Sequence, residues 1–198
     1  MKHLRGFGLG LVIFGLPILG CVQQPGDRSD SGWIMLLDGS NLAYWMTVGK
    51  ANWRVVDGVV QADQGNGYLV SKNSYRDFQI RAEFWVDTPA NSGIFIRCAD
   101  PQKIGTATCY EVNINDDRPE ADYSTGAIVG VAKVSPPIPK AGGRWNTMEI
   151  TAKGPQMSVV LNGVRTAEGR DAKLANGPIS IQYTRGLVKF RKLQIRPL

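Results

Sequence analysis

The stretch FQIRAEFWV, residues 78–86, decides the fold, because apolar and polar side chains alternate along it with a period of two. Its odd-numbered partners are Gln, Arg, Glu and Trp, while its other positions are Phe, Ile, Ala, Phe and Val. Successive side chains of a β-strand point to opposite faces, so this pattern predicts a half-buried strand. We therefore expect the segment to lie in a sheet with one face on the core.

Further strand-like runs lie on both sides of this stretch, and no segment carries a helical stripe. They are residues 53–56, 59–62, 68–71, 93–98, 109–115, 127–131, 145–151, 157–161, 179–183 and 187–195. Asp57-Gly58 and Asn162-Gly163 each separate two such runs, which is the signal of a two-residue hairpin turn with positive φ. Many short strands with regular turn signals predict an all-β fold, a two-sheet antiparallel sandwich or jelly roll.

The last run changes phase. Val188 and Phe190 keep one alternation and Leu193 and Ile195 keep the other. One extra residue in a strand produces such a slip, so the sequence predicts a β-bulge near residues 191 and 192.

The N-terminal segment resembles an export signal. A basic start with Lys2 and Arg5 precedes an apolar run over residues 6–19, and Ile18-Leu19-Gly20-Cys21 resembles a bacterial lipobox. We expect a signal peptide over residues 1–20, a lipidated Cys21, a linker over residues 21–31 and one domain over residues 32–198. A membrane-spanning helix is the alternative, but polar residues follow Cys21 at once. The expected location is the bacterial cell envelope, lipid-anchored at the outer membrane or the periplasmic face.

The amino-acid composition excludes several kinds of binding and catalytic site. The 198 residues include 23 Lys and Arg against 17 Asp and Glu, a net charge of +6, but no long basic run that would favour nucleic-acid binding. The one histidine, His3, lies inside the expected signal peptide. The mature chain would therefore have no Ser-His-Asp triad and no His-ligated metal. Acid-base chemistry must use carboxylates, Lys, Tyr or a metal-bound water.

Two cysteines remain besides Cys21. Cys98 and Cys109 would be exported to an oxidising compartment, where two thiols eleven residues apart tend to pair, so we expect a disulfide. The alternative, a metal site or a nucleophilic thiol, has no neighbouring His or Cys cluster to support it.

The run CYEVNIND, residues 109–116, carries the main functional signal. Tyr, Val and Ile alternate there with Glu111, Asn113 and Asn115. Asn is depleted in strands, so this polar row predicts a binding groove, with a plain solvated face as the alternative. Retaining glycosidases need two carboxylates about 5 Å apart, and the two Asn residues stand where further acids would be required. Ordinary two-carboxylate hydrolysis is therefore poorly supported.

Nine motifs together resemble the 3-keto-disaccharide hydrolase domain family. They are GWIMLLDGSNLAYW (32–45), WRVVDGVV (53–60), YRDFQIRAEF (75–84), NSGIFIR (91–97), YEVNIND (110–116), TGAIVG (125–130), GRWNTMEI (143–150), LNGV (161–164) and VKFRKLQIRPL (188–198). The resemblance implies a concanavalin A-like or glucanase-like jelly roll that acts on glycosides oxidised to a ketone at sugar carbon 3. It also implies a functional link to a sugar 3-dehydrogenase.

That substrate class needs only one base. A ketone at carbon 3 acidifies the proton on carbon 2, and its removal allows the carbon 1 substituent to leave by β-elimination, followed by addition of water. The resemblance implies that Glu111 is this base and that Arg97 binds or polarises sugar oxygens. As an alternative, Arg97 and Glu111 form only a cross-strand ion pair. The strand register decides whether the two share a face: direct pairing of the cysteines separates them, and a one-residue offset brings them together.

The remaining site residues follow from the same resemblance. Asn113 and Asp116 would be hydrogen-bond or metal ligands, and Trp145 and Asn146 would line the groove, with a core position as the alternative for Trp145. No cofactor is required, although Glu111, Asp116 and amide oxygens suit a divalent cation such as Ca²⁺, Mg²⁺ or Mn²⁺.

The chain departs from the family near its C-terminus. Many members have Gln followed by Asp-His-Gly after the penultimate strand, where this chain reads Gln182-Tyr183-Thr184-Arg185. Gln182 can still bind a hydroxyl, and Tyr183 can donate a proton or stack on a sugar. The competing hypotheses are a lipid-anchored carbohydrate-binding module and a purely structural envelope lipoprotein without sugar affinity.

Overall fold

The computed structural model describes residues 32–198, together with Met1. Gly32–Leu198 forms one compact unit. The predicted signal peptide, the lipidated Cys21 and the linker lie outside the described residues and stay predictions. No helix in residues 32–198 is long and apolar enough to cross a membrane.

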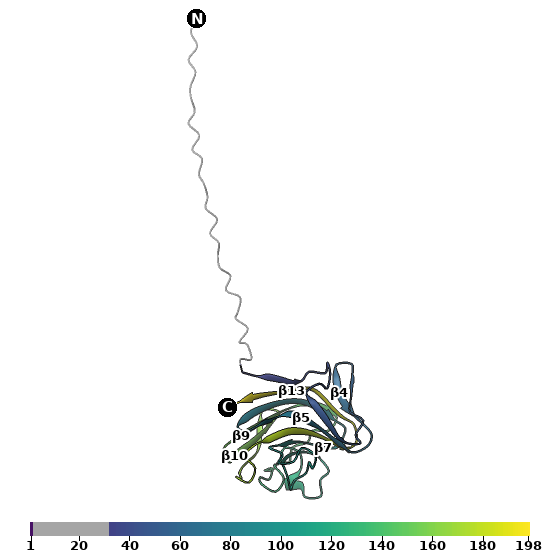
Figure 1. The fold of residues 1–198 in the computed structure, drawn as a ribbon, viewed down its shortest axis with the longest axis vertical. Helices are drawn as coiled ribbons and strands as arrows, with labels where there is room; N and C mark the ends of the chain where they lie inside the picture. The colour runs from purple at the N-terminus through teal and green to yellow at the C-terminus, as the bar shows by residue number, and fades with distance from the viewer. Residues whose placement is uncertain (2–31) are drawn as a thin grey trace. The chain divides into compact units, whose positions relative to one another are not determined.

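Two antiparallel sheets form the domain (Figure 1). The eight-stranded sheet has the order β11 (Val164–Arg170), β10 (Gln156–Leu161), β9 (Arg144–Lys153), β6 (Phe78–Val86), β13 (Val188–Pro197), β4 (Val59–Ala62) and β3 (Arg54–Val56), with β1 (Ile34–Leu37) also on β13. The five-stranded sheet has the order β2 (Trp45–Gly49), β5 (Gly67–Tyr75), β12 (Gly177–Arg185), β7 (Asn91–Ile96) and β8 (Tyr110–Ile114). The helical content of residues 32–198 is one 3₁₀ turn, Ala121–Tyr123. The predicted all-β sandwich is confirmed.

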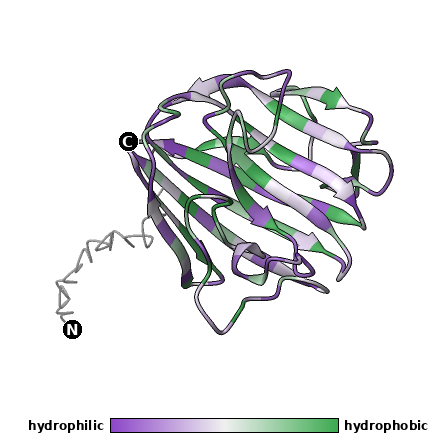
Figure 2. Cartoon of the chain, turned by 90° about the horizontal axis from the view of Figure 1, so that it is seen from below, coloured by the Kyte–Doolittle hydropathy of each residue, from purple (hydrophilic) through white to green (hydrophobic). Residues whose placement is uncertain are grey.

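The core lies between the two sheets. Alternate side chains of β6 supply its centre, and all five predicted inward positions are buried. The alternation of hydrophobic and hydrophilic residues along the strands is visible in Figure 2. Each sheet therefore presents a second, outward face, and these two faces differ in character.

The turn and bulge predictions are confirmed. Asp57-Gly58 joins β3 to β4 and Asn162-Gly163 joins β10 to β11, and all four residues have positive φ. The register between β13 and β6 shifts between Phe190 and Lys192, which places the extra residue at Arg191.

The strand expected over residues 127–131 is wrong. Ile128 makes isolated bridges to Val112 and Ala132, and its N–H donates to the Ala132 carbonyl within a tight turn. Gly126 and Gly130 on either side have positive φ, which curls the apolar run instead of extending it. Three strands carried too little alternation to be predicted: β1, β2 and β11.

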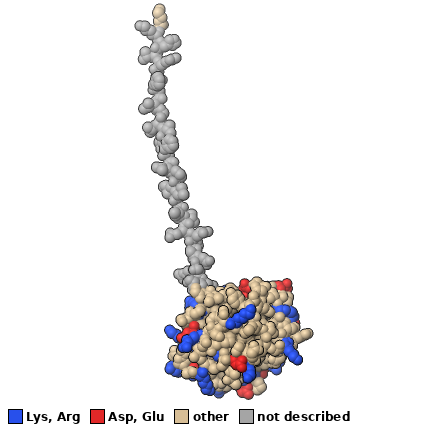
Figure 3. Space-filling model, viewed as in Figure 1, with Lys and Arg blue, Asp and Glu red and all other residues tan. Residues whose placement is uncertain are grey.

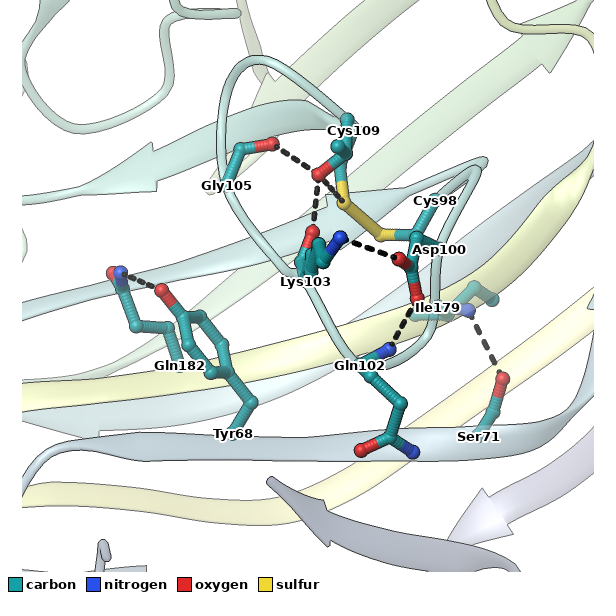
Figure 4. Close-up of a disulfide and its surroundings, with 11 residues drawn as sticks. Tyr68, Ser71, Cys98, Asp100, Gln102, Lys103, Gly105, Cys109, Ile179 and Gln182 are labelled. Carbon is teal, nitrogen blue, oxygen red and sulfur yellow. Dashed lines mark hydrogen bonds and ion pairs between the residues drawn. A yellow bond between two sulfur atoms is a disulfide. The ribbon is translucent and has the colours of Figure 1, made fainter. Parts of the chain in front are cut away.

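The disulfide between Cys98 and Cys109 is confirmed. It closes the loop that follows β7 and precedes β8, and its sulfurs pack with Phe95 on the outward side of the five-stranded sheet. Tyr68 and Ile104 pack against the same small cluster. Figure 4 shows this loop, together with the contact between Gln182 and Tyr68.

Candidate functional site

Most of the polar residues that the sequence singled out on strands lie on the outward face of the five-stranded sheet. Cross-strand pairing aligns Tyr68 with Gln182, Gln182 with Gly93, and Gly93 with Asn113. The next row aligns Val70, Ser180, Phe95 and Glu111. We call the side chains Tyr68, Phe95, Glu111, Asn113, Ser180 and Gln182 the five-stranded face.

Glu111 is the acid of this face. Its side chain is only 7% exposed, and within residues 32–198 no hydrogen bond reaches its carboxylate. Burial raises the pKa of Glu111 to about 6, and the positive charge of Arg118 opposes this rise. A carboxylate with a pKa near neutrality can both accept and return a proton at physiological pH.

Gly93 gives Glu111 its space. A Cβ atom at position 93 would lie 3.3 Å from Glu111 Oε1 and 3.2 Å from the Val112 carbonyl oxygen. A larger residue there would crowd the carboxylate, so the glycine of NSGIFIR has a packing role beside the acid.

Three buried polar atoms on the five-stranded face have no hydrogen-bond partner within the described residues. Asn113 Oδ1, Ser180 Oγ and Gln182 Oε1 accept or donate no hydrogen bond within the described residues. Their neighbouring atoms are fixed: Asn113 Nδ2 donates to the Tyr123 carbonyl at 2.7 Å, and Gln182 Nε2 donates to the Tyr68 hydroxyl at 3.3 Å. Each unpaired buried polar atom costs about 1–3 kcal/mol. Three on one face are typical of a surface built to bind a polar ligand rather than to stabilise the fold.

Asp116 has a structural position. Its carboxylate accepts hydrogen bonds from the Thr125 hydroxyl at 2.6 Å and from the N–H groups of Ala141 and Gly142 at 2.9 Å and 2.8 Å. These bonds join the two ends of the long loop between β8 and β9. Asp116 therefore fastens the loop instead of facing a ligand.

The divalent-cation prediction depends on these carboxylates. Residues 32–198 contain no group of three or more His, Cys, Asp or Glu side chains that could hold a metal. Asp116 is engaged by the loop, so Glu111 is the carboxylate of the predicted ligand set that has no hydrogen-bond partner within the described residues. The cation stays a prediction.

Arg97 does not reach Glu111, and the ion pair given as the alternative to a catalytic role is not formed. The register is the one-residue offset, with Phe95 opposite Glu111, which would have placed both residues on one face. However, β7 ends at Ile96 and Arg97 has a φ of 53°, a left-handed conformation that turns its side chain away.

The Arg97 guanidinium, 1% exposed, anchors other segments. It donates to the carbonyls of Arg76 and Gly154 at 2.8 Å and 2.7 Å and to Asp77 Oδ1 at 3.0 Å. The cation whose charge acts on Glu111 is instead Arg118, which the sequence analysis missed. Arg118 follows β8 in an irregular loop, where no periodic pattern could reveal it.

Trp145, Asn146 and Tyr183 also lie away from Glu111. Trp145 is 37% exposed on the outward face of the eight-stranded sheet, so neither a groove position beside Glu111 nor a core position is correct. Asn146 is buried and donates to the carbonyls of Ala141 and Arg144. Tyr183 points into the core, where its ring packs edge-on against Trp53. It is next to Gln182 on one strand, so the two side chains must face opposite ways.

A sequence model of the 3-keto-alpha-glucoside-1,2-lyase-like domain matches residues 32–196. The chain belongs to this family. A curated relative, the 3-keto-disaccharide hydrolase of Bacteroides thetaiotaomicron, is 24% identical over 160 residues, covering 65% of this chain and 54% of the relative. The chain thus spans about half the length of that relative.

Solved structures share the fold of this family member. Two proposed glycosyl hydrolases from Parabacteroides distasonis superpose with TM-scores of 0.76 and 0.68, at 19% and 29% identity. The first alignment covers 84% of this chain and 94% of the other, and the second covers 84% and 99%. A carbohydrate-binding module, CBM66 from Bacillus subtilis, superposes with a TM-score of 0.59 at 14% identity, covering 83% of this chain and 95% of the module. The predicted family and jelly-roll fold are confirmed.

Proposed function

We propose that the protein cleaves the glycosidic bond of 3-keto-glycosides, with Glu111 as the base that removes the proton from carbon 2. The observation that carries the proposal is the state of Glu111: buried, without a hydrogen-bond partner in the described residues, and with its pKa raised to about 6. Structural carboxylates are normally paired or hydrogen-bonded when buried. A carboxylate held in this way is suited to proton transfer.

The reaction needs one base because the ketone supplies the activation. Glu111 accepts the proton from carbon 2, and the electron pair of that C–H bond moves to form an enediolate with its charge on the carbon 3 oxygen. When the ketone re-forms, a double bond develops between carbons 1 and 2, and the bond from carbon 1 to the leaving oxygen breaks. The leaving oxygen takes up the proton from Glu111, which returns Glu111 to its carboxylate form. Addition of water, with hydroxyl to carbon 1 and a proton to carbon 2, completes a net hydrolysis.

Neighbouring groups would support the charge and the sugar. Arg118 is the cation acting on Glu111, and its positive charge would also stabilise an enediolate nearby. Asn113 and Gln182 present buried oxygens without partners, which can accept hydrogen bonds from sugar hydroxyl groups. Because Glu111 is mostly covered, only the edge of a sugar ring can approach its carboxylate.

The substrate must come from another enzyme. A ketone at carbon 3 is formed by oxidation of a secondary alcohol, so a sugar 3-dehydrogenase would supply the glycosides that this protein cleaves. The carbohydrate-binding folds among the structural relatives, including a Man3GlcNAc-bound VIP36 domain at 7% identity, are in keeping with a sugar ligand.

The test is release of a chromogenic leaving group from a 3-keto-glucoside, with the unoxidised glucoside as the blank. Glu111→Gln keeps the size of the side chain and removes the base. Glu83→Gln is the matched control, because Glu83 lies on the outward side of β6 in the other sheet. We expect release from the ketone only, abolished in Glu111→Gln and kept in Glu83→Gln. A parallel series with EDTA decides whether a divalent cation takes part.

The second candidate is a carbohydrate-binding module without catalysis. The structural match to CBM66 favours it, because the same fold serves there as a binding module. Saturable sugar binding by wild type, with no release from the ketone and little change in Glu111→Gln, would replace the enzyme proposal with this one.

A further inference from the structure

The outward face of the eight-stranded sheet carries tryptophans and cations that the proposed reaction does not use. Trp85 on β6 pairs directly with Trp145 on β9. Trp33 lies on the same face, because Arg81 and Arg196, both on outward positions, stack on its ring. Met35, 38% exposed, pairs with Gln194 beside them. We call Trp33, Met35, Trp85 and Trp145, with Arg81, Lys189, Arg191, Lys192 and Arg196, the eight-stranded face.

Lys and Arg side chains form several cation–π contacts with tryptophan rings on this face. Arg81 lies 4.4 Å from the Trp33 ring centre and Arg191 lies 4.4 Å from that of Trp145. Lys189 lies 5.1 Å from the centre of the Trp85 ring. The stacking keeps each cation beside the indole at the surface. A side-by-side arrangement of indole and Lys or Arg is typical of proteins that contact the headgroup region of a membrane.

The net charge of the eight-stranded face is positive. Its five cations share the outward face of the sheet with the carboxylates of Glu83 and Glu149, and with Glu168 on β11, which forms an ion pair with Arg165. Glu83 Oε2 accepts from Arg191 Nε at 2.6 Å, and Glu149 pairs with Arg81 in the strand register. On the side of the molecule drawn in Figure 3, Lys and Arg lie in several separate groups with acidic residues between them.

The domain begins on this face. Gly32 packs near the Arg196 side chain, and Trp33 is the next residue. The predicted lipidated residue, Cys21, precedes Trp33 by twelve residues, a reach of about 40 Å at most when fully extended. A tether of this length would hold the eight-stranded face at high effective concentration near the bilayer.

We propose that the eight-stranded face docks on the anionic phospholipid headgroups of the membrane that carries the anchor. The cations would contact headgroup phosphates, and Trp145 and Met35 would enter the interfacial layer. The two outward faces lie on opposite sides of the sandwich, so this docking directs the five-stranded face toward the aqueous phase. The inference rests on this surface and on the predicted anchor at Cys21, and it is independent of the proposed reaction.

The test is binding of residues 32–198, one compact unit with the whole described core, to vesicles. Phosphatidylglycerol-containing vesicles are compared with pure phosphatidylcholine vesicles over a range of salt. We expect binding to the anionic vesicles that weakens with salt. Lys189→Gln with Lys192→Gln should weaken it about 5-fold for each charge removed. Trp145→Ala should weaken it further.

The matched control is Lys103→Gln with Lys173→Gln, which removes the same charge from exposed residues away from this face. The control variant should bind like wild type. Equal weakening in both double variants, no binding to anionic vesicles, or binding to a soluble acidic polysaccharide in place of vesicles would each overturn the proposal. Thermal unfolding of every variant establishes that weaker binding is not a loss of fold.

Discussion

The two outward faces of this sandwich arise from the same alternation of side chains but differ in how their polar groups are satisfied. On the eight-stranded face most charged groups are paired or stacked, as with Arg191, which contacts both Glu83 and Trp145. On the five-stranded face, the loop after β8 contacts Asn113 through the Tyr123 carbonyl, and Glu111 is buried without a hydrogen-bond partner in the described residues. Oxygens of Asn113 and Gln182 on the same face are also unpaired. Buried atoms without a partner occur on both faces, since Gln194 Oε1 and Arg196 Nε on the eight-stranded sheet also lack one. Within the described residues, only the five-stranded face combines such atoms with a buried carboxylate, that of Glu111.

If the loop between β8 and β9 is what buries the five-stranded face, removing the hydrogen bonds that hold this loop should have the largest effect on stability. Asp116→Ala deletes the acceptor of bonds from Thr125, Ala141 and Gly142. Several buried donors are left unpaired, so the free energy of unfolding should fall by about 3–4 kcal/mol, measured by denaturant unfolding. Asp122→Ala, which breaks only an exposed ion pair with Lys133, is the control and should change it by less than about 1 kcal/mol. An equal loss of unfolding free energy in both variants would show that Asp116 does not hold this loop in place.

The disulfide provides a second test of the difference between the two faces, because it closes a loop beside the five-stranded sheet. Replacing Cys98 and Cys109 together by Ser should lower the free energy of unfolding by about 3 kcal/mol, since the unfolded chain regains the entropy of an open loop. Chemical unfolding with and without reductant measures this. Wild type under reducing conditions should match the double variant, and a double variant as stable as oxidised wild type would contradict the account.

The buried, unpartnered carboxylate of Glu111 predicts a smaller effect on the free energy of unfolding, and this effect depends on pH. Its pKa is about 6 in the folded protein and near 4.5 when unfolded, so the folded state binds the proton more tightly. Stability should therefore fall as the pH rises from about 4.5 to about 6, by up to about 2 kcal/mol. Glu111→Gln removes this dependence and should be more stable than wild type at pH 7.

Thermal unfolding of both proteins between pH 4 and pH 8 measures the difference. Glu83→Gln, which loses a partly exposed ion pair, should not gain stability at pH 7. A Glu111→Gln variant less stable than wild type at pH 7 would mean that the carboxylate is a stabilising group, and the contrast between the two faces would fail.

The smallest effect is expected on the eight-stranded face. Trp145→Ala removes an exposed ring stacked with Arg191, and cleavage of a 3-keto-glucoside should stay within about twofold of wild type because the residue lies on the other sheet. Steady-state kinetics of the two proteins provide the measurement. A loss of turnover of tenfold or more would place Trp145 in the substrate groove, as the family resemblance implied.

The sequence predicted strands well where the alternation of apolar and polar residues was regular, as over residues 78–86. It predicted those site residues that lie within such strands. Glu111 and Asn113 were found because a period of two places them on one face, whereas Gln182 was found through the family resemblance. Arg97 was misplaced because a single positive φ after β7 redirects its side chain. Arg118 was missed because it reaches Glu111 from an irregular loop. Contacts made by loops and by strand ends depend on tertiary packing that no local pattern encodes.

The most direct test of the central claim is to cleave a 3-keto-glucoside in D₂O and to examine carbon 2 of the sugar product by NMR. Elimination followed by hydration removes the original proton from carbon 2 and adds one from the solvent. The account predicts deuterium at carbon 2 in the product of wild type, with no product above the enzyme-free blank from Glu111→Gln. A product that keeps its original carbon 2 proton would show direct hydrolysis and would contradict the role of Glu111 as the base.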